Sequence, residues 1–356
     1  MSAYLNAIGT AVPDQDVHKS FIGWAGSQLA DAIEQKLFAR MARRSGIAHR
    51  WSVLPSGPEG GSPVDMGGFY HGEDPGTAAR MALYARHAPV LAQAAVSALG
   101  DAFAPQNITH MVVASCTGFM APGLDQVLAK MLGIRPTVER QMVGFMGCYG
   151  AIAALRAARH IVRSQPVAQV LLVCVELSSL HLQRGRNLEG LLAMLQFGDG
   201  AAAAVISANA DGLQLGTPFC ATLPDSEALI QWHVGDHGFE MILSGEVPGQ
   251  LAHALAQSAL LPVEPRTIDG WAIHPGGRSI LDAVEHGLTL PEDALADSRG
   301  VLNDHGNMSS ATLMFVLERM MRRRADQLPR RALALAFGPG VAAEGMLLGA
   351  DGELQA

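Results

Sequence analysis

The chain contains the sequence FGDGAAA at residues 197–203 and a near copy, FGPGVAA, at residues 337–343. Each copy follows a segment of helical character and joins two apolar runs through glycines, so each predicts a β-hairpin. The same hairpin at the end of two segments indicates an internal duplication. We therefore expect an α/β protein with two similar halves, residues 1–210 and 211–356, which meet near residues 209–212.

Predicted strands and helices alternate along the chain, which is typical of an α/β fold. The run at 170–175 is continuously apolar, as in a strand that is buried on both faces of a sheet. The Gly- and Pro-rich stretch 55–76 predicts a loop. We expect strands at 110–115, 170–175 and 270–273, and helices at 77–99 (with Thr77 as the cap), 125–132, 150–164, 247–261 and 309–324.

The composition is that of a globular protein with a large core. The chain has 356 residues, of which 49% are hydrophobic and 16% are charged. Its net charge of −8 argues against a nucleic-acid partner, and we interpret the basic cluster Arg319, Arg322, Arg323 and Arg324 as the solvated end of a helix. No signal peptide is visible, and no apolar stretch approaches the ~20 residues that span a bilayer. Because the four cysteines do not make a disulfide framework, we expect a reducing cytoplasm.

Cys148 is the first candidate for a chemical role. It stands between Gly147 and Tyr149, where a loop leads into the helix predicted at 150–164. A helix N-terminus carries partial positive charge, which favours a thiolate and lowers the pKa of a cysteine. The alternative is a buried structural cysteine, which is how most free cysteines behave. Cys116, just after a predicted strand, is a second candidate nucleophile, whereas Cys174 lies within an apolar strand and is predicted to be core.

An imidazole and a carboxamide complete a set of three groups. His274 ends a predicted strand and precedes Pro275 and two glycines, and strand ends are where α/β proteins place functional side chains. Asn307 follows Gly306 just before a predicted helix, so its amide either caps a turn or points toward an oxyanion. A satisfied core histidine is the alternative for His274. A thiol, an imidazole and a carboxamide together indicate acyl transfer through a thioester.

A metal site is not expected. His233 and His237 are four residues apart, but Gly235 and Gly238 disfavour the helix that would bring them together. We expect neither a metal ion nor a bound cofactor.

Over nearly its whole length the chain resembles the type III polyketide synthases of the chalcone synthase superfamily. Ketoacyl synthase III enzymes share the Cys, His and Asn, but not the sequences HPGG at 274–277 and GNMSS at 306–310. The segments that carry the resemblance stand in the family's order and spacing: those around Cys148, 197–200, 247–249, 274–277, 306–310 and 337–340.

The resemblance implies a thiolase-type fold, a five-layered αβαβα body, and a homodimer. It also implies that Cys148 is the site of acyl loading and that His274 and Asn307 complete a triad. The other positions that it implies are the gatekeepers Phe197 and Met241, the cavity residues Cys116, Thr117, His181, Trp232 and Ser309, the CoA-binding Arg40 and Arg44, and the scaffold loop Gly338, Pro339 and Gly340.

Several positions depart from the plant enzymes, so the plant product is not implied. Cys116 replaces a Thr, which resembles bacterial members such as tetrahydroxynaphthalene synthases. An indole at 232 should shorten or reroute the cavity, because the plant enzymes have Gly there. The remaining departures are Ala121 for a Met that crosses the dimer interface, His181 for a small residue, Met241 for Phe, and Ala336 for Gly.

The predicted function is a polyketide synthase that takes a starter acyl-CoA and malonyl-CoA as its partners. It would cyclise the extended chain to a pyrone or to a resorcinol- or phloroglucinol-type aromatic. Three alternatives stay open: a ketoacyl synthase III-like or thiolase-like enzyme of single condensation, an inactive thiolase-fold partner protein, which the intact triad opposes, and a cysteine hydrolase, which Asn307 disfavours. The sequence does not determine the starter, the number of extensions, the cyclisation mode or the use of methylmalonyl-CoA.

Overall fold

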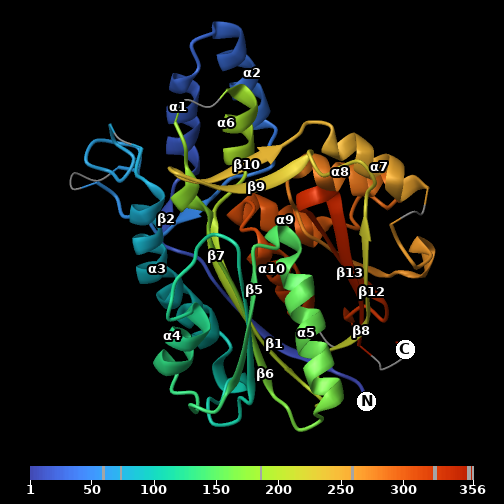
Figure 1. The fold of residues 1–356 in the computed structure, drawn as a ribbon. Coiled ribbons are helices and arrows are strands. Elements are labelled where there is room, and N and C mark those ends of the chain that lie inside the picture. The colour runs from blue at the N-terminus through green and yellow to red at the C-terminus, as the bar shows by residue number, and fades with distance from the viewer. Residues whose placement is uncertain are drawn as a thin grey trace.

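Most of the strands form one mixed sheet that runs through the whole molecule (Figure 1). Its order is β11-β12-β13-β8-β1-β7-β6-β4-β5. The two halves of this sheet meet where β1 pairs with β8 over two residue pairs, Tyr4 with Gln214 and Leu5 with Leu213. The computed structural model describes residues 1–57, 61–72, 74–184, 187–257, 260–323, 327–350 and 354.

The two halves of the sheet share one topology. In each half a parallel pair of strands is followed by two antiparallel pairings. In the first half β4 is parallel to β6, and β7 and β1 follow antiparallel. In the second half β11 is parallel to β12, and β13 and β8 follow antiparallel. The two similar halves predicted from the sequence are therefore present. The strands are β1 (Tyr4–Ala11), β4 (His110–Ser115), β5 (Glu139–Gly144), β6 (Val170–Leu177), β7 (Asp199–Ser207), β8 (Leu213–Thr222), β11 (Gly270–Ile273), β12 (Ala332–Gly338) and β13 (Ala342–Gly349).

Helices build three further layers around the sheet (Figure 1). In the middle lie α5 (Gly150–Ser164) and α10 (Ser310–Met321), which contact strands of both halves. The sheet halves lie on either side of this pair, and the outer faces are covered by the remaining helices. This arrangement is the predicted five-layered αβαβα body. The outer helices are α3 (Thr77–Ser97) and α4 (Leu124–Met131) on one half, and α7 (Val247–Ala256), α8 (Arg278–Gly287) and α9 (Ala296–His305) on the other.

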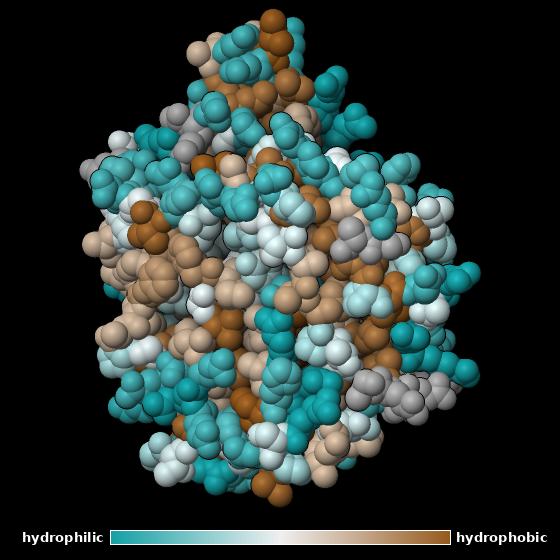
Figure 2. All heavy atoms as spheres, turned by 45° about the vertical axis from the view of Figure 1, so that its right-hand side comes forward, coloured by the Kyte–Doolittle hydropathy of each residue, from teal (hydrophilic) through white to brown (hydrophobic). Residues whose placement is uncertain are grey.

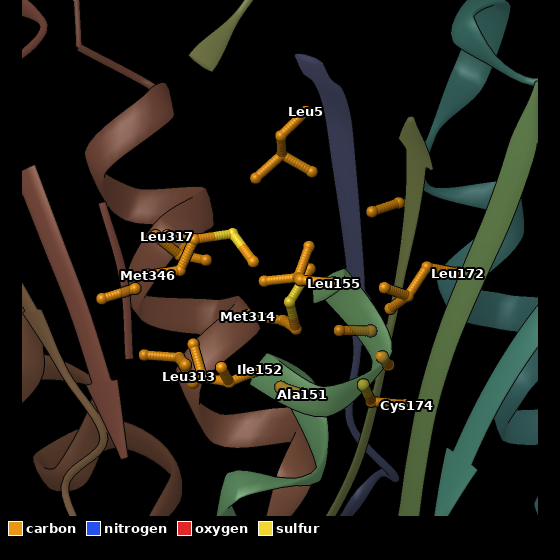
Figure 3. Packing of buried hydrophobic residues seen from close by; sticks show 14 of the residues in the cluster. Leu5, Ala151, Ile152, Leu155, Leu172, Cys174, Leu313, Met314, Leu317 and Met346 are labelled. Carbon is orange, nitrogen blue, oxygen red and sulfur yellow. The ribbon is translucent and has the colours of Figure 1, made fainter. Parts of the chain in front are cut away.

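The sequence of the two central helices explains their place. In α10 every residue from Ser310 to Leu317 is buried and most are apolar, and a helix that is apolar all round belongs in a core. Figure 3 shows Leu155 of α5 beside Met314 of α10, with Leu172 of β6 on one side and Met346 of β13 on the other. Truncating such a side chain to Ala typically costs about 2–5 kcal/mol of stability. This shared core therefore binds the two halves together.

A lobe projects from one end of the sheet and carries part of the active-site wall (Figure 1). It consists of α1 (His18–Gln28), α2 (Ala32–Arg43) and α6 (Leu188–Met194), whose apolar side chains form their own cluster. The hairpin of β9 (Ile230–Gly235) and β10 (Gly238–Leu243) lies beneath the lobe. Figure 2 shows the lobe at the top of a face on which hydrophilic and hydrophobic residues are interspersed. A small ladder of β2 (Gln15–Asp16) and β3 (Trp51–Ser52) joins the lobe to the sheet end.

Most predicted elements are confirmed, several of them to the residue. The strands at 110–115 and 270–273 and the helix at 150–164 have the predicted bounds. The helix predicted at 77–99 is capped by Gly76, because the Thr77 hydroxyl instead bonds to the β9–β10 turn. Four helices end earlier than predicted: α3 at Ser97, α4 at Met131, α7 at Ala256 and α10 at Met321. Residues 258 and 259 and Arg324 lie outside the described residues.

The two copies of the repeat end differently, and one of the two predicted hairpins is wrong. Gly338 pairs with Ala342, so the second copy forms the tight β12–β13 hairpin that was predicted. The first copy begins β7, which is antiparallel to β6, but the chain leaves the sheet between them to form a 3-10 turn, η3 (Ser178–His181), and α6. This segment supplies residues of the cavity described below. The first half of the protein thus has the same antiparallel strand pair as the second, with a cavity-forming insertion between its two strands.

The remaining structural expectations concern the surface and the cysteines. The basic cluster is ion-paired, because Arg319, Arg322 and Arg323 contact Asp304, Glu318 and Asp297 respectively. Cys174 is buried in β6, and all four cysteines are free. None of the helices in the described part of the chain has both the length and the apolar character that a membrane crossing requires.

Candidate active site

The thiol of Cys148 is placed by a short 3-10 turn, η2 (Gly147–Tyr149), which leads directly into α5. Gly147 has a φ of 70°, and a Cβ at this position would lie 2.6 Å from Cδ of Pro339, so a larger residue does not fit. The Gly147 N–H donates to Sγ of Cys116 at 3.0 Å. The turn thereby holds Cys148 in the wall of a cavity of about 400 Å³.

The carboxamide of Asn307 lies against this thiol. Sγ of Cys148 is 3.9 Å from both Oδ1 and Nδ2 of Asn307. Oδ1 accepts a hydrogen bond from the Ser309 N–H (2.8 Å), and Nδ2 donates to the Gly276 carbonyl (3.1 Å). These partners orient the amide and use one of its two N–H donors, while the second faces Sγ of Cys148 in the cavity wall.

The imidazole of His274 lines the same cavity. Its backbone N–H extends the β11–β12 ladder by donating to the Leu335 carbonyl at 2.8 Å, which places the side chain at the end of a strand. The ring is 1% exposed, and neither nitrogen has a hydrogen-bond partner among the residues that the structure describes. A buried, neutral imidazole has one donor and one acceptor to offer. Both are available to a substrate or to the thiol.

The protonation state of the thiol differs from the prediction. The helix start next to Cys148 predicts a lowered pKa, but burial raises the pKa of this thiol to about 11, and hydrogen bonds with Asn307 and Ser309 offset only part of that effect. Burial likewise lowers the pKa of His274 to about 3. Each group alone is therefore uncharged at neutral pH. Transfer of the thiol proton to the imidazole creates no net charge, and it is the step that would generate a nucleophile.

A buried carboxyl group that no motif in the sequence indicated, that of Glu176, lies near Cys148. Oε2 of Glu176 accepts hydrogen bonds from the Cys116 N–H and the Thr117 hydroxyl, both at 2.9 Å, and Oε1 accepts one from the Ser310 hydroxyl. Burial raises the pKa of Glu176 to about 7. The carboxyl joins the loop after β4 to the start of α10. Its one signal in the sequence is an acidic residue at the end of an apolar strand.

Cys116, the second candidate nucleophile, also lines the cavity. Its Sγ accepts a hydrogen bond from the Gly147 N–H, and burial raises the pKa of the Cys116 thiol well above its ordinary value. The thiol of Cys116 therefore supports the turn that carries Cys148.

Most of the predicted cavity positions line the same cavity as Cys148, His274 and Asn307. The predicted gatekeepers Phe197 and Met241 are among them, and so are Thr117, Trp232, Ser309, Gly338 and Pro339. Gly340 does not; its φ is 69°, and its carbonyl accepts a hydrogen bond from the Ser226 hydroxyl.

His181 was predicted as a cavity residue, but it does not line the cavity that holds Cys148. Its Nδ1 accepts from the Phe239 N–H at 3.0 Å, and its Nε2 lies 2.8 Å from the Thr117 carbonyl. These two bonds turn the ring into the gap between the β9–β10 hairpin and the loop after β4. Burial lowers the pKa of His181 to about 3, which leaves it neutral.

Three arginines surround the mouth of the cavity. Arg40 and Arg44, predicted to contact CoA, lie at the end of α2 and line a surface recess of about 380 Å³. This recess shares Met41 and three further residues with the active-site cavity. Arg278, at the start of α8, lines it as well and was not singled out from the sequence. Its Nη1 donates to the Arg44 carbonyl at 3.2 Å, so the two guanidinium-bearing segments are in contact.

No metal centre is evident in the part of the chain that the structure describes, where no three His, Cys, Asp or Glu residues form a suitable group. His233 bonds to Gln231, and His237 to the Asp74 carbonyl.

Comparison with known proteins shows the family of the chain. A family model of chalcone and stilbene synthases, N-terminal domain, matches residues 1–210, and one of their C-terminal domain matches residues 214–350. Bisdemethoxycurcumin synthase of Oryza sativa subsp. japonica is 31% identical over 376 residues, which cover 96% of this chain and 91% of that protein.

Solved structures are similar over the whole length. PKS-I from the brown alga Ectocarpus siliculosus is 27% identical, with a TM-score of 0.86 over 98% of both chains. The C-terminal type III polyketide synthase domain of Steely1 from Dictyostelium shares the fold at 24% identity, with a TM-score of 0.86 over 98% of this chain and 99% of that one. The chain thus belongs to the chalcone and stilbene synthase family and is a type III polyketide synthase, an acyltransferase-type condensing enzyme.

Proposed function

We propose that this polyketide synthase loads a starter acyl group from CoA onto Cys148, extends it with malonyl-CoA and cyclises the product to a pyrone or to a resorcinol- or phloroglucinol-type aromatic. One observation carries the proposal: the Cys148 thiol meets the amide of Asn307 at 3.9 Å in a cavity that the unpartnered imidazole of His274 also lines.

Loading would proceed by exchange of thioesters. His274 takes the proton of the Cys148 thiol, and the thiolate attacks the acyl carbonyl of acyl-CoA. The C–S bond to CoA breaks, and the imidazolium returns the proton to the departing CoA thiolate. The oxyanion formed on the way is stabilised by the Asn307 N–H that the Gly276 carbonyl does not use.

Extension would use the same two side chains a second time. When malonyl-CoA binds, its carboxylate leaves as CO₂ and the electron pair of the broken C–C bond forms a thioester enolate. The N–H groups of His274 and Asn307 face the enolate oxygen. The carbanion attacks the acyl group on Cys148, the Cys148 thiolate leaves, and the lengthened chain departs on CoA, ready to be loaded again.

The three arginines at the mouth suit the phosphates of CoA, since guanidinium groups bind phosphate by charge-assisted hydrogen bonds. The whole reaction runs on CoA thioesters, and we propose no metal or bound cofactor. We also propose a cytoplasmic homodimer, with the exposed Phe119 and Met142 at the subunit contact. Light scattering after size-exclusion chromatography tests the dimer directly.

The test of loading is intact-mass spectrometry after incubation with acyl-CoA. Cys148→Ala should show no acyl adduct, whereas Cys116→Ser should show one, because a hydroxyl can still accept the Gly147 N–H. An adduct of equal yield on Cys148→Ala would refute the assignment of the nucleophile. A panel of acyl-CoAs with malonyl-CoA, compared with the same acyl groups on acyl carrier protein, then gives the starter and separates this function from a ketoacyl synthase III-like one.

A further inference from the structure

A second, mostly apolar cavity of about 80 Å³ adjoins the active-site cavity. It lies between the lobe, the segment after β3 and the β9–β10 hairpin, and His181 is in its wall. The two cavities share one layer of residues, which we call the partition: Ser178, Ala193, Phe197, Trp232 and Met241 line both of them. A group that crosses the partition passes from Cys148 into the second cavity.

The wall of the second cavity includes a buried guanidinium with a free donor. Arg50 is 3% exposed, and its Nη1 donates to the carbonyls of Met194 (3.0 Å) and Phe197 (2.7 Å). Its Nε donates to Nδ1 of His18 at 3.0 Å. Nη2 is buried and has no partner among the described residues. A buried charged donor without a partner is costly, so an oxygen acceptor in this cavity would be bound strongly.

Neighbouring carboxylates do not use this donor. The carboxylate of Asp199 accepts instead from the Val53 N–H (2.8 Å) and from the N–H and hydroxyl of Ser179 (2.7 and 2.6 Å). Asp16 accepts from the backbone N–H of Arg50 and from His49. Both carboxylates stabilise the positive charge from a distance and leave Nη2 unpaired.

The partition has one member suited to movement. The Trp232 indole is held by a hydrogen bond to the Cys116 carbonyl (3.1 Å), and the backbone beside Phe197 is held by a β-bridge to Asn307. Met241 pairs with Trp232 across the hairpin, but its side chain is an unbranched thioether with three rotatable bonds. The Met241 side chain is therefore the one in the partition that could turn aside without breaking a hydrogen bond.

We propose that the second cavity binds the distal end of the acyl group held on Cys148, and that Arg50 Nη2 donates to a carbonyl or carboxylate oxygen at that end. The Met241 side chain turns aside to admit the acyl group to the second cavity. This inference rests on the proposed loading of Cys148. It assigns the native enzyme a preference for acyl groups that carry oxygen at the end remote from the thioester.

The experiment measures acyl loading of the wild-type protein by intact mass. The probes are three series of acyl-CoAs of increasing length: methyl-terminated, ω-oxo and ω-carboxy. At the length that reaches Arg50, the oxygen-terminated chains should load at least about tenfold faster than the methyl-terminated chain, which is the effect of one hydrogen bond to a charged group. The ω-oxo and ω-carboxy arms tell whether the site takes any carbonyl or only an anion.

Two variants test the location of the effect and leave Arg50, with its structural carbonyl bonds, in place. Val64→Phe fills the second cavity from a position that does not line the first. Met241→Phe replaces the flexible thioether between the two cavities with a rigid ring. Both should abolish the preference. Val167→Phe, the same change at an 88% exposed site, is the matched control and should retain it.

The failures are distinguishable. If no acyl-CoA loads, including acetyl-CoA, whose acyl group ends before the partition, the proposed function is wrong. If acetyl-CoA loads but oxygen-terminated chains gain nothing at any length, or if the preference persists in Val64→Phe, the inference is overturned.

Discussion

Phe197 and Asn307, far apart in the sequence, are partners in an isolated parallel β-bridge. The Gly198 N–H donates to the Asn307 carbonyl at 2.9 Å, and the Asn307 N–H donates to the Gln196 carbonyl at 2.8 Å. Gly306 permits this approach, because its φ is 66° and a Cβ there would lie 2.8 Å from the Gln196 carbonyl oxygen. The aromatic ring in the cavity wall and the carboxamide beside the thiol are thus positioned by one piece of backbone.

Replacing Asn307 by Ala should slow both half-reactions, because each of them places negative charge on a thioester oxygen. The variant lacks the amide donor for the enolate, and loss of one such donor typically lowers a rate by ~10²–10³. We expect it to release CO₂ from malonyl-CoA at this reduced rate and to take up a starter acyl group on Cys148 more slowly than the wild type, but still to completion, measured by intact mass. Asn303→Ala, on the exposed side of α9, is the control. A wild-type rate of CO₂ release from Asn307→Ala would remove the amide from the mechanism.

Replacing His274 by Ala should make the reactivity of Cys148 depend steeply on pH. The folded pKa of this thiol is raised to about 11, so without a base the thiolate fraction rises about tenfold per pH unit from neutrality toward about pH 10. In the wild type the imidazole accepts the proton, and the profile of carbamidomethylation by iodoacetamide should be flatter. Peptide mapping keeps Cys148 apart from the exposed Cys220. Parallel profiles for the two proteins would show that His274 does not act as the base.

The fold could be read from the sequence where local signals agree with the tertiary structure. The helix at 150–164 has apolar residues at helical spacing, the strands at 110–115 and 270–273 are short and largely apolar, and the bounds of all three were correct. The first repeat misled because FGDG at 197–200 resembles a tight turn, whereas the chain inserts η3 and α6 before it.

The site was predictable only in part, because several of its contacts join residues that are far apart in the sequence. Cys148, His274 and Asn307 stand among glycines that mark close approaches, and this pattern is visible in one dimension. The bonds of Glu176 to residues of two other elements, and the free donor of Arg50, follow from the packing of segments remote in sequence. The direction of the Cys148 pKa shift was wrong because burial outweighs the helix start, and burial is a tertiary property.

Glu176→Gln should make the protein less sensitive to alkaline pH. The carboxyl has a pKa of about 7 when folded and an ordinary value of 4.5, so its contribution to stability is fully present below about pH 4.5 and is lost as pH rises through about 7. The penalty at higher pH is on the order of 1–3 kcal/mol. Gln keeps the shape and stays neutral, and the hydroxyls of Thr117 and Ser310 can turn to match it.

The measurement for this variant is the thermal midpoint at about pH 5.5 and about pH 8.5. Between the lower and the higher pH, the thermal midpoint of the wild type should fall further than that of Glu176→Gln. Glu139→Gln, at a side chain that is 71% exposed, should behave like the wild type. Equal losses in wild type and Glu176→Gln would mean that the carboxyl does not titrate in this range.

Arg278→Ala should weaken acyl-CoA binding without slowing the chemistry. The side chain is exposed and pairs at 3.5 Å with Asp282, so the loss should be modest, up to about fivefold in KM, with kcat unchanged. The effect should shrink as salt rises, because exposed charges are screened. Arg266→Ala, at an 84% exposed arginine that lines none of the three cavities, is the matched control. A fall in kcat at unchanged KM would place Arg278 outside the CoA site.

Trp232→Gly should join the two cavities and lengthen the chains that the enzyme handles. The indole lines both cavities, donates to the Cys116 carbonyl at 3.1 Å, and packs edge-on against His181 and Phe239. Its removal therefore connects the active-site cavity of about 400 Å³ with the second cavity of about 80 Å³. Longer starters should load, or more malonyl units should be added, and mass spectrometry of the products reads either outcome.

The change should also lower stability, by about 3 kcal/mol, since loss of a large aromatic side chain removes contacts and a hydrogen bond. Trp232→Phe is the matched control: it keeps a ring in the partition and loses the bond to the Cys116 carbonyl, so its products should stay short although its thermal midpoint falls. Circular dichroism establishes that each variant is folded. If folded Trp232→Gly makes the wild-type products from the wild-type starters, the indole does not limit chain length, and the remaining partition residues, Phe197 and Met241, must set that limit without it.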